Sequence, residues 1–305
     1  MLVNRSNLQI IFRNLKTSFQ KSFDAAEVQW PKFAMLIPST GELNDYSWIE
    51  YFPKMREWVG EKVIKSLSGK RYELRNKDFE ATIEVDRNHI EDDQLGIYRP
   101  MAEMAGYSAR QLPDELMFAV LSGGWNGECF DGKKFYADDH PVGGGAASNQ
   151  FTKALDVSTY AKAKESYGAA VVRMQNFKDD EGRPLNIMPN VLVVPPALRD
   201  SARVLMSAEF FKNREPNPYR GECVVVSDPR LATATEWHLL DTSKPMGALI
   251  YQERKKPVFL EQTDMSGGSA PDSVFMQRKY RYSVECRGAG GYGFWQMAHG
   301  SKGTG

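Results

Sequence analysis

The stretch from Tyr46 to Tyr98 constrains the fold of this chain most, because it is dense in strand patterning and has no group placed for catalysis. Within it, Trp58 to Ile64 and Arg71 to Arg75 flank a turn-forming run from Ser66 to Lys70. This arrangement predicts a long hairpin that projects from the subunit. A long charged hairpin has little core of its own to lie on, so we expect its face to meet another subunit.

The last part of that stretch alternates strictly between apolar and polar residues. Strict alternation predicts a strand with one packed face and one wet face. The apolar positions are Phe79, Ala81, Ile83 and Val85, and the polar positions are Glu80, Thr82, Glu84 and Asp86.

Length and charge define the general class of protein. A chain of 305 residues with 42% hydrophobic residues can bury a real core, which indicates a globular protein of one or two domains. Its 39 basic residues balance its 39 acidic residues. The overall field therefore gives no reason to expect tight nucleic-acid binding, and net charge does not oppose close packing of copies.

The cysteines and the apolar runs indicate where the chain folds. Cys129, Cys223 and Cys286 are odd in number, far apart and without C-x-x-C spacing, which favours buried, reduced thiols over a disulfide or zinc framework. The sequence has neither an apolar run long enough to cross a bilayer nor a secretory signal with its cleavage site. We therefore expect folding in a cytoplasm.

The segment from Asn7 to Phe23 predicts a basic amphipathic helix, because its apolar residues recur at intervals of three and four. Alone, this pattern fits a docked terminal helix or a mitochondrial transit peptide, which is also acid-poor and amphipathic. The apolar positions are Leu8, Ile11, Phe12, Leu15, Phe19 and Phe23, and the basic positions are Arg5, Arg13, Lys16 and Lys21.

The rest of the chain predicts a mixture of helices and strands, which is an α+β fold. Helices are expected from Pro100 to Gly124, where Pro113, Asp114 and Glu115 fit a first turn, and from about Ser158 to Met174, after a loop-rich region. The segment from Pro189 to Gln262 predicts a compact subdomain, with a helix from Ala197 to Ala208. A glycine-rich linker and a long strand follow. The expected strands are Val191–Val194, Cys223–Val226, Trp237–Leu240, Ala248–Tyr251, Val258–Leu260 and Ser273–Arg287.

One cluster resembles a catalytic or metal site. Asp138, Asp139 and His140 place two carboxylates beside an imidazole, which could bind a metal or share a proton. A following proline and three glycines favour a turn instead, and consecutive residues point in different directions. Cys129 is interpreted as a core thiol, because the sequence offers it no base except the distant His140.

The run from Gly288 to Gly293 matches the G-x-G-x-x-G pattern of dinucleotide-binding loops. Only twelve residues follow Gly293 (305 − 293 = 12), too few for the helix, strand and acidic residue that such a cofactor site needs. The run is therefore interpreted as a glycine-rich bend between two strands. We expect no catalytic, cofactor-binding or metal-binding residues in the chain.

Five segments of the sequence together resemble the Mu-like phage major head subunit (gpT) family. The likeness runs from about Asn7 to Ser301, and its specificity lies in the order and joint presence of the segments. They are SNLQIIFRNLKTSFQKSF, PKMREWVGEKVIKSLSGKRYELRNKDFEATIEVDRNHIEDDQLGIY, CFDGKKFYADDHPV, PNVLVVPPALRD and RKYRYSVECRGAGGYGFWQMAHGS.

The resemblance implies the Hong Kong 97 type of phage capsid fold, with four parts. Residues 1–45 would form an N-terminal arm and residues 46–85 an extended loop hairpin. Residues 86–188 and 263–305 would form a peripheral domain with a long spine helix, and residues 189–262 an axial domain. The chain would then be a head protein that self-assembles into an icosahedral shell enclosing phage DNA.

The resemblance also implies which residues make contacts between subunits. Some related shells add covalent Lys–Asn cross-links, for which Lys65 and Lys70 near the loop tip are candidates by position only, and no such bond is predicted. The extended-loop residues expected at the assembly interface are Arg56, Glu57, Trp58, Glu61, Lys62, Lys65, Leu67, Lys70 and Arg71. The arm residues are Leu8, Phe12, Arg13, Leu15, Lys16 and Phe19.

The partners implied are further copies of the chain in pentamers and hexamers, a scaffold and a protease during assembly, a portal and a decoration protein. Packaged double-stranded DNA would be contacted without sequence specificity, and no membrane is involved. The protein would be assembled in the bacterial cytoplasm and end in the virion. Two alternatives stay open from the sequence: an encapsulin-like compartment shell, and a metal-dependent hydrolase that uses Asp138, Asp139 and His140.

Overall fold

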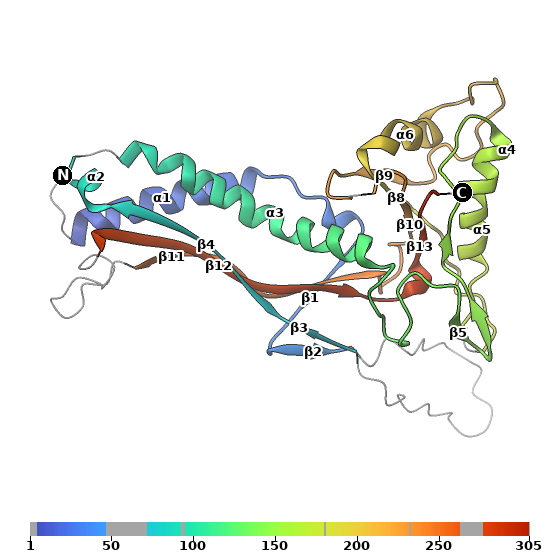
Figure 1. Cartoon of the computed structure of the whole chain (residues 1–305), viewed down its shortest axis with the longest axis horizontal. Helices are drawn as coiled ribbons and strands as arrows, with labels where there is room; N and C mark the ends of the chain where they lie inside the picture. Colours follow the sequence, from blue (N-terminus) through green and yellow to red (C-terminus); the bar gives the residue numbers. More distant parts are fainter. Residues whose placement is uncertain are drawn as a thin grey trace.

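The computed structural model describes residues 5–46, 72–92, 95–179, 181–231, 233–262 and 277–304. Figure 1 shows an elongated α+β molecule with a sheet at each end. At one end, two long helices lie along one face of a four-stranded sheet. At the other end, shorter helices surround a five-stranded sheet.

The four-stranded sheet is built from long strands and one short edge strand. β1 runs parallel to β11, and the remaining pairs are antiparallel. Alternating apolar side chains on β12 and β4 turn to the face that the helices cover. In spatial order the strands are β1 (Met35–Pro38), β11 (Leu249–Gln262), β12 (Lys279–Tyr292) and β4 (Lys77–Asp86).

Helices α1 (Arg5–Ala25) and α3 (Arg99–Gly123) pack against each other and against this sheet. Their backbones approach closely at Gly106, where an added Cβ would lie 2.3 Å from the carbonyl oxygen of Phe19. Only glycine allows this distance, so the sequence determines where the two helices meet. The predicted amphipathic N-terminal helix is confirmed.

The strand alternation predicted for Phe79 to Val85 is confirmed where it matters for packing. Ile83 and Val85 are 4% and 0% exposed and belong to the core beneath α1. The expectation that this part of the hairpin lacks a core of its own is therefore wrong. Pairing with β12 brings β4 under the helices, where its apolar side chains are buried.

Helix α3 confirms the helix predicted from Pro100 to Gly124, with one correction. Pro113 and Asp114 lie inside the helix and do not form its first turn. Asp114 is buried, and its carboxylate accepts hydrogen bonds from the backbone N–H groups of Gln29 and Trp30. It thereby ties the short 3-10 helix η1 (Trp30–Lys32) to α3.

The second and larger core surrounds the five-stranded sheet and extends to the start of β11 and the ends of β12 and α3. All four residues of β8 and of β10 are buried, as expected for strands in the centre of a sheet. In spatial order the strands are β7 (Gln150–Phe151), β13 (Ala298–Ser301), β10 (Trp237–Leu240), β8 (Val191–Val194) and β9 (Val224–Ser227).

One continuous helical segment and one separate helix flank this sheet. The segment comprises α4 (Tyr160–Ala163), the π-helical turn η4 (Lys164–Gly168) and α5 (Ala169–Gln175), which confirms the predicted second helix. Helix α6 (Arg199–Ser207), which follows the 3-10 turn η5 (Pro196–Leu198), packs on β8 and β9.

Sheet membership departs from the division of the chain that the resemblance implied. β11 is one strand of 14 residues and spans two predicted strands, because irregular pairing between Glu253 and Val258 lets it continue past Pro257. It belongs to the four-stranded sheet although it lies in the segment 189–262. Conversely, β13 lies in the segment 263–305 but pairs with β10 of the five-stranded sheet.

The glycine-rich run after Arg287 is strand, and the predicted bend there is wrong. β12 continues through Tyr292, and the glycines make room for neighbouring elements. An added Cβ would lie 2.8 Å from the Val120 side chain at Gly290 and 2.3 Å from the Leu74 side chain at Gly291. Small residues here allow close packing against α3 and β3, which accounts for the motif without a nucleotide.

The described structure also contains two short ribbons and several short helices and turns. Predictions made for residues 47–71 and 273–276 lie outside the described residues. No helix among the described residues is long and apolar enough to span a membrane. The elements are β2 (Leu43–Asp45) paired with β3 (Glu73–Arg75), β5 (His140–Val142) paired with β6 (Gly145–Ala147), α2 (Arg87–Glu91), η3 (Leu95–Ile97) and η6 (Trp295–Met297), and a turn at Phe211–Arg214.

Candidate functional site

The residues predicted for the assembly hairpin lie outside the described part of the chain, so their positions stay predictions. What the structure does place is the base of that hairpin. β2 and β3 pair antiparallel, and the Tyr46 N–H donates to the Tyr72 carbonyl at 2.7 Å. The predicted interface residues that lie outside the described part of the chain are Arg56, Glu57, Trp58, Glu61, Lys62, Lys65, Leu67, Lys70 and Arg71.

The predicted arm residues divide into two faces of α1. Leu8, Leu15 and Phe19 are buried against the sheet and α3, and the Phe12 ring stacks on Phe259 with a centroid distance of 5.7 Å. Burying a large apolar side chain contributes roughly 1.5–3 kcal/mol, so the helix is held firmly on its own subunit. The apolar stripe is thus covered within the chain, as a docked terminal helix requires.

The opposite face of α1 is cationic and open. Arg13, Lys16 and Lys21 are exposed, and the helix contains one acid, Asp24, near its end. The Lys16 ammonium lies over the Phe12 ring, 5.7 Å from its centroid, while the Lys16 side chain stays exposed to water. This face can attract a polyanion through charge alone.

An exposed apolar stripe on α3 was not predicted from the sequence. Met101, Met104 and Tyr107 follow Ile97 along one face, and Met104 is 73% exposed. A groove of about 500 Å³ beside them is lined in part by Ser22 and Arg230. Contiguous exposed apolar side chains are typical of protein interaction surfaces. The sequence pattern did not distinguish this exposed stripe, because α3 also has a buried apolar face.

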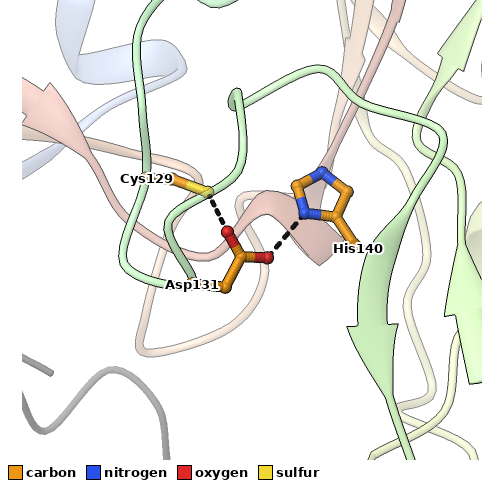
Figure 2. Close-up of side chains that lie close together, drawn as sticks. All are labelled: Cys129, Asp131 and His140. Atoms are coloured by element: carbon orange, nitrogen blue, oxygen red, sulfur yellow. Dashed lines mark hydrogen bonds and ion pairs between the residues drawn. The ribbon is translucent and has the colours of Figure 1, made fainter. Parts of the chain in front are cut away.

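The three cysteines are buried and free, as predicted. One of them, Cys129, belongs to the cluster shown in Figure 2, where Asp131 lies between Cys129 and His140. The Cys129 thiol donates to Asp131 Oδ1 at 3.0 Å, and His140 Nδ1 lies 2.7 Å from Asp131 Oδ2. The backbone N–H of Lys133 also donates to Asp131, at 2.9 Å. All three side chains are buried.

Packing and further hydrogen bonds hold this cluster in place. The His140 ring stacks on Trp295, with centroids 4.0 Å apart and planes 6° apart. Asn149 Oδ1 accepts from the Ala137 N–H and lies 3.3 Å from His140 Nε2. The Asn149 amide donates to the carbonyls of Phe135 and Trp295. The irregular segment between α3 and β7 is therefore fastened to η6 through buried polar contacts.

Two pKa shifts describe the charge state of the cluster. Burial, followed by the neighbouring Asp131 charge, raises the pKa of the Cys129 thiol far above its usual value, so the sulfur keeps its proton. Burial alone would raise the pKa of Asp131, but hydrogen bonds from His140, Cys129 and Lys133 hold that pKa below its usual value. A protonated thiol beside an ionised carboxylate is a stable hydrogen-bonded pair and a poor nucleophile.

The cluster differs from the grouping on which the hydrolase alternative was based. Asp138 and Asp139 are exposed, and Asp139 forms an ion pair with Lys133 at the surface. The carboxylate that faces His140 is Asp131, which spacing along the sequence did not single out. Cys129, Asp131 and His140 are the one set of three metal-ligating side chains whose ligand atoms lie within 4.8 Å of one another among the described residues. The hydrogen bonds from the thiol and from Lys133 already satisfy Asp131 Oδ1 without a metal.

Replacing Asp131 by asparagine should lower the free energy of unfolding by about 1–2 kcal/mol, because the cluster loses its charged acceptor. Chemical denaturation of the dissociated subunit measures this. The matched control is Asp138→Asn, which changes an exposed carboxylate in the same region and should alter stability by less than about 0.5 kcal/mol. A fall in stability of the wild type on chelation would instead reveal a structural metal.

Solved structures with this arrangement define the class of protein. The procapsid protein of bacteriophage JBD30 is 30% identical, with a TM-score of 0.61 over 98% of this chain and 76% of that chain. The JBD30 capsid protein is 28% identical, with a TM-score of 0.59 over 70% of this chain and 94% of that chain. A virus-like particle from Pyrococcus furiosus, 10% identical with a TM-score of 0.56, shares the fold alone. The fold is the Hong Kong 97 type of phage capsid proteins.

Sequence comparison identifies the particular family within this class. The family model described as Mu-like prophage major head subunit gpT matches residues 8–163, 156–231 and 228–304. The chain belongs to this family. It is 29% identical to the major capsid protein of Escherichia phage Mu, over 99% of this chain and 76% of that protein. It is 28% identical to the Mu-like prophage FluMu major head subunit of Haemophilus influenzae, over 97% of this chain and 73% of that protein.

The family membership confirms the predicted fold class and function. The chain is a phage major capsid protein, a structural component of the virion head. The match to phage head subunits along the chain does not favour the compartment and hydrolase alternatives.

Proposed function

We propose that many copies of this chain, arranged as pentamers and hexamers, close into an icosahedral shell around double-stranded phage DNA, and that the chain catalyses no reaction. The observation that carries this proposal is the family match, which extends from residue 8 to residue 304. The likeness to a phage procapsid protein over 98% of the chain supports it. Many modest contacts repeated by symmetry would hold such a shell together.

We propose that the two sheets correspond to the two domains of the capsid fold. The four-stranded sheet with α1 and α3 would be the peripheral domain, with α3 as its spine helix. Residues 1–45 would be the arm, which packs on this sheet through α1. The five-stranded sheet with α4, α5 and α6 would be the axial domain at the capsomer centre. The support is that α1 covers a separate core on the four-stranded sheet, whereas the core of the five-stranded sheet extends only to the start of β11 and the ends of β12 and α3.

The extended loop from residue 46 to residue 85 would contact a neighbouring subunit through its outer part. The described portion of this loop supports the proposal in one respect. β4 is anchored on its own subunit, and the β2–β3 ribbon leads away from the four-stranded sheet (Figure 1). An anchored base allows the remaining residues, among them Trp58 and Lys62, to reach a second copy.

Further partners would act during and after assembly. We expect a scaffold and a protease while the shell forms, and a portal at one vertex. A decoration protein is also proposed, because the JBD30 capsid protein comes from a capsid described as decorated with minor capsid protein trimers.

Negative-stain electron microscopy of the chain expressed with its neighbouring head genes tests the proposed function. Uniform hollow particles, with nuclease-protected DNA in complete virions, are the expected result. Small soluble species from that co-expression would contradict shell formation. Hollow particles that retain a cargo enzyme in place of DNA would point to a compartment.

The cationic face of α1 is proposed to contact packaged DNA on the inner side of the shell. Replacing Arg13, Lys16 and Lys21 together by glutamine should lower the yield of DNA-filled particles about threefold, because phosphate neutralisation is lost. Glutamine keeps apolar stem atoms over the helix. DNA content per particle, measured by absorbance across a salt series, should differ most at low salt, where charges are least screened.

A matched control removes the same number of charges elsewhere. Lys77, Arg254 and Lys256 are exposed on β4 and β11 and not on α1. Their replacement by glutamine should leave DNA content unchanged. Equal DNA loss in both triple variants would contradict a specific role for α1.

A further inference from the structure

A buried polar network lies where the β2–β3 ribbon joins the four-stranded sheet. Gln252 of β11 is at its centre and is 0% exposed, and Asn76, between β3 and β4, is 6% exposed. The network draws one side chain from the sheet and several from the ribbon and its flanks. Its members are Ser39, Asn44, Tyr46, Asn76 and Gln252.

The Gln252 amide is fully satisfied by groups on the ribbon. Its Oε1 accepts from the Tyr46 hydroxyl at 2.7 Å. Its Nε2 donates to Asn76 Oδ1 at 2.7 Å and to the Leu74 carbonyl at 3.1 Å. One buried side chain of the sheet therefore contacts both strands of the ribbon, just after β2 and within β3.

Asn76 extends the network to the segment before β2. Its Nδ2 donates to Ser39 Oγ at 2.9 Å and to the Gly41 carbonyl at 3.0 Å. Ser39 Oγ in turn donates to Asn44 Oδ1 at 2.9 Å. The buried groups of Ser39 and Asn76 would be left without hydrogen-bond partners if the ribbon turned relative to the sheet.

A two-stranded ribbon has little core of its own, so its direction depends on how it is attached. Apolar contacts such as Leu74 against Gly291 favour closeness but tolerate sliding and rotation. Hydrogen bonds are directional, and a fully satisfied buried network specifies one arrangement. An apolar residue at position 252 could bury the same area. The polar character of this junction therefore indicates that it fixes the direction of the ribbon and does not only stabilise the contact.

We propose that Gln252, together with Asn76, is a positioning residue for assembly: it holds the β2–β3 ribbon in one direction relative to the sheet. This inference rests on the proposed function, in which the loop that the ribbon carries contacts a neighbouring subunit. Gln252 is fully buried within its own subunit. It acts through the ribbon, by fixing where the two ends of that loop leave the subunit.

The test compares Gln252→Met, which keeps the volume and removes both hydrogen-bonding groups, with Asn217→Leu. Asn217 is a matched control in the other half of the molecule, because its buried amide donates to the carbonyls of Leu205 and Ala208 at 2.8 Å and 2.9 Å. Both substitutions should lower the melting temperature of the dissociated subunit by similar amounts. Only Gln252→Met should lower the yield of normal shells, by about tenfold.

Hydrogen exchange gives a readout that a merely stabilising role would not change. In Gln252→Met, the ribbon amides of Tyr46 and Asn76, which donate to Tyr72 and Glu42, should exchange faster than in Asn217→Leu. Tyr46→Phe removes a single hydroxyl and keeps the fold, and should lower the shell yield about threefold. This milder variant keeps the test valid if Gln252→Met does not fold.

The outcomes separate the inference from the function on which it rests. Normal shells from Gln252→Met and Tyr46→Phe, beside normal shells from the wild type, would overturn the positioning role alone. Failure of the wild type to form shells would overturn the proposed function. Equal loss of shells in Asn217→Leu would mean that Gln252 affects assembly only through the stability of the subunit, which would overturn the positioning role.

Discussion

Deletion of Ser66 to Lys70 should yield a folded subunit that forms no shells. The reason is that, in the proposed assembly, the tip of the extended loop would contact a neighbouring copy, whereas both cores lie in the described residues. A closed shell repeats each contact many times, so losing one class of contact affects every subunit. Circular dichroism and a cooperative thermal transition establish folding, and electron microscopy of the co-expressed protein establishes whether shells form.

A replacement of the same five residues by glycine and serine is the matched control for loop length. If the side chains of Leu67 and Lys70 make the contact, this replacement should also abolish shells. If it assembles normally, loop length is what matters and the predicted interface residues at the tip are not needed. Normal shells from the deletion itself would contradict the assembly role of the loop.

The sequence predicted those elements whose pattern is set by a single partner surface. α1 and β12 each bury one face, so their apolar residues repeat with the period of a helix or a strand. α3 was recognised for the same reason. Its N-terminal end was accurate, but Pro113 was misplaced because a proline in mid-helix resembles a helix start when the sequence is considered alone.

The sequence did not predict contacts that depend on long-range assembly. Asp131 faces His140 because the irregular segment folds back on itself, and Gln252 meets Asn76 across 176 positions of the chain. Neither pair has a local pattern. The continuous β11 was divided in two because Pro257 and the nearby charges interrupt the apolar run, although irregular pairing lets the strand continue.

The same limit applies to His299, which is one of the most deeply buried ionisable groups among the described residues. It lies in the middle of β13, is 0% exposed, and contacts the Phe151 ring edge-on with centroids 4.6 Å apart. Neither ring nitrogen has a hydrogen-bond partner among the described residues. Burial, followed by the charges of Arg173 and His238, lowers the pKa of His299 to about 3.

This pKa predicts that acid destabilises the subunit. The unfolded chain binds a proton at His299 below a pH of about 6.5, whereas the folded chain binds one only near pH 3. Above pH 6.5 the His299 ring is neutral in both the folded and the unfolded chain, so it does not make stability depend on pH. As the pH falls from 6.5 toward 3, only the unfolded chain is protonated, and the folded state loses stability. Between pH 7 and pH 4 this group alone should remove about 3 kcal/mol from the free energy of unfolding.

Replacing His299 by leucine should remove that contribution, because leucine is apolar and does not titrate. Chemical denaturation of dissociated subunits at pH 7 and pH 4 should show a fall in stability about 3 kcal/mol smaller than in the wild type. Phe151→Leu is the matched control, because it alters the same packing and leaves the imidazole in place, so it should keep the acid dependence of the wild type. Equal acid dependence in His299→Leu and the wild type would mean that His299 is protonated in the folded subunit near neutral pH, and that β13 admits water or a partner to its ring.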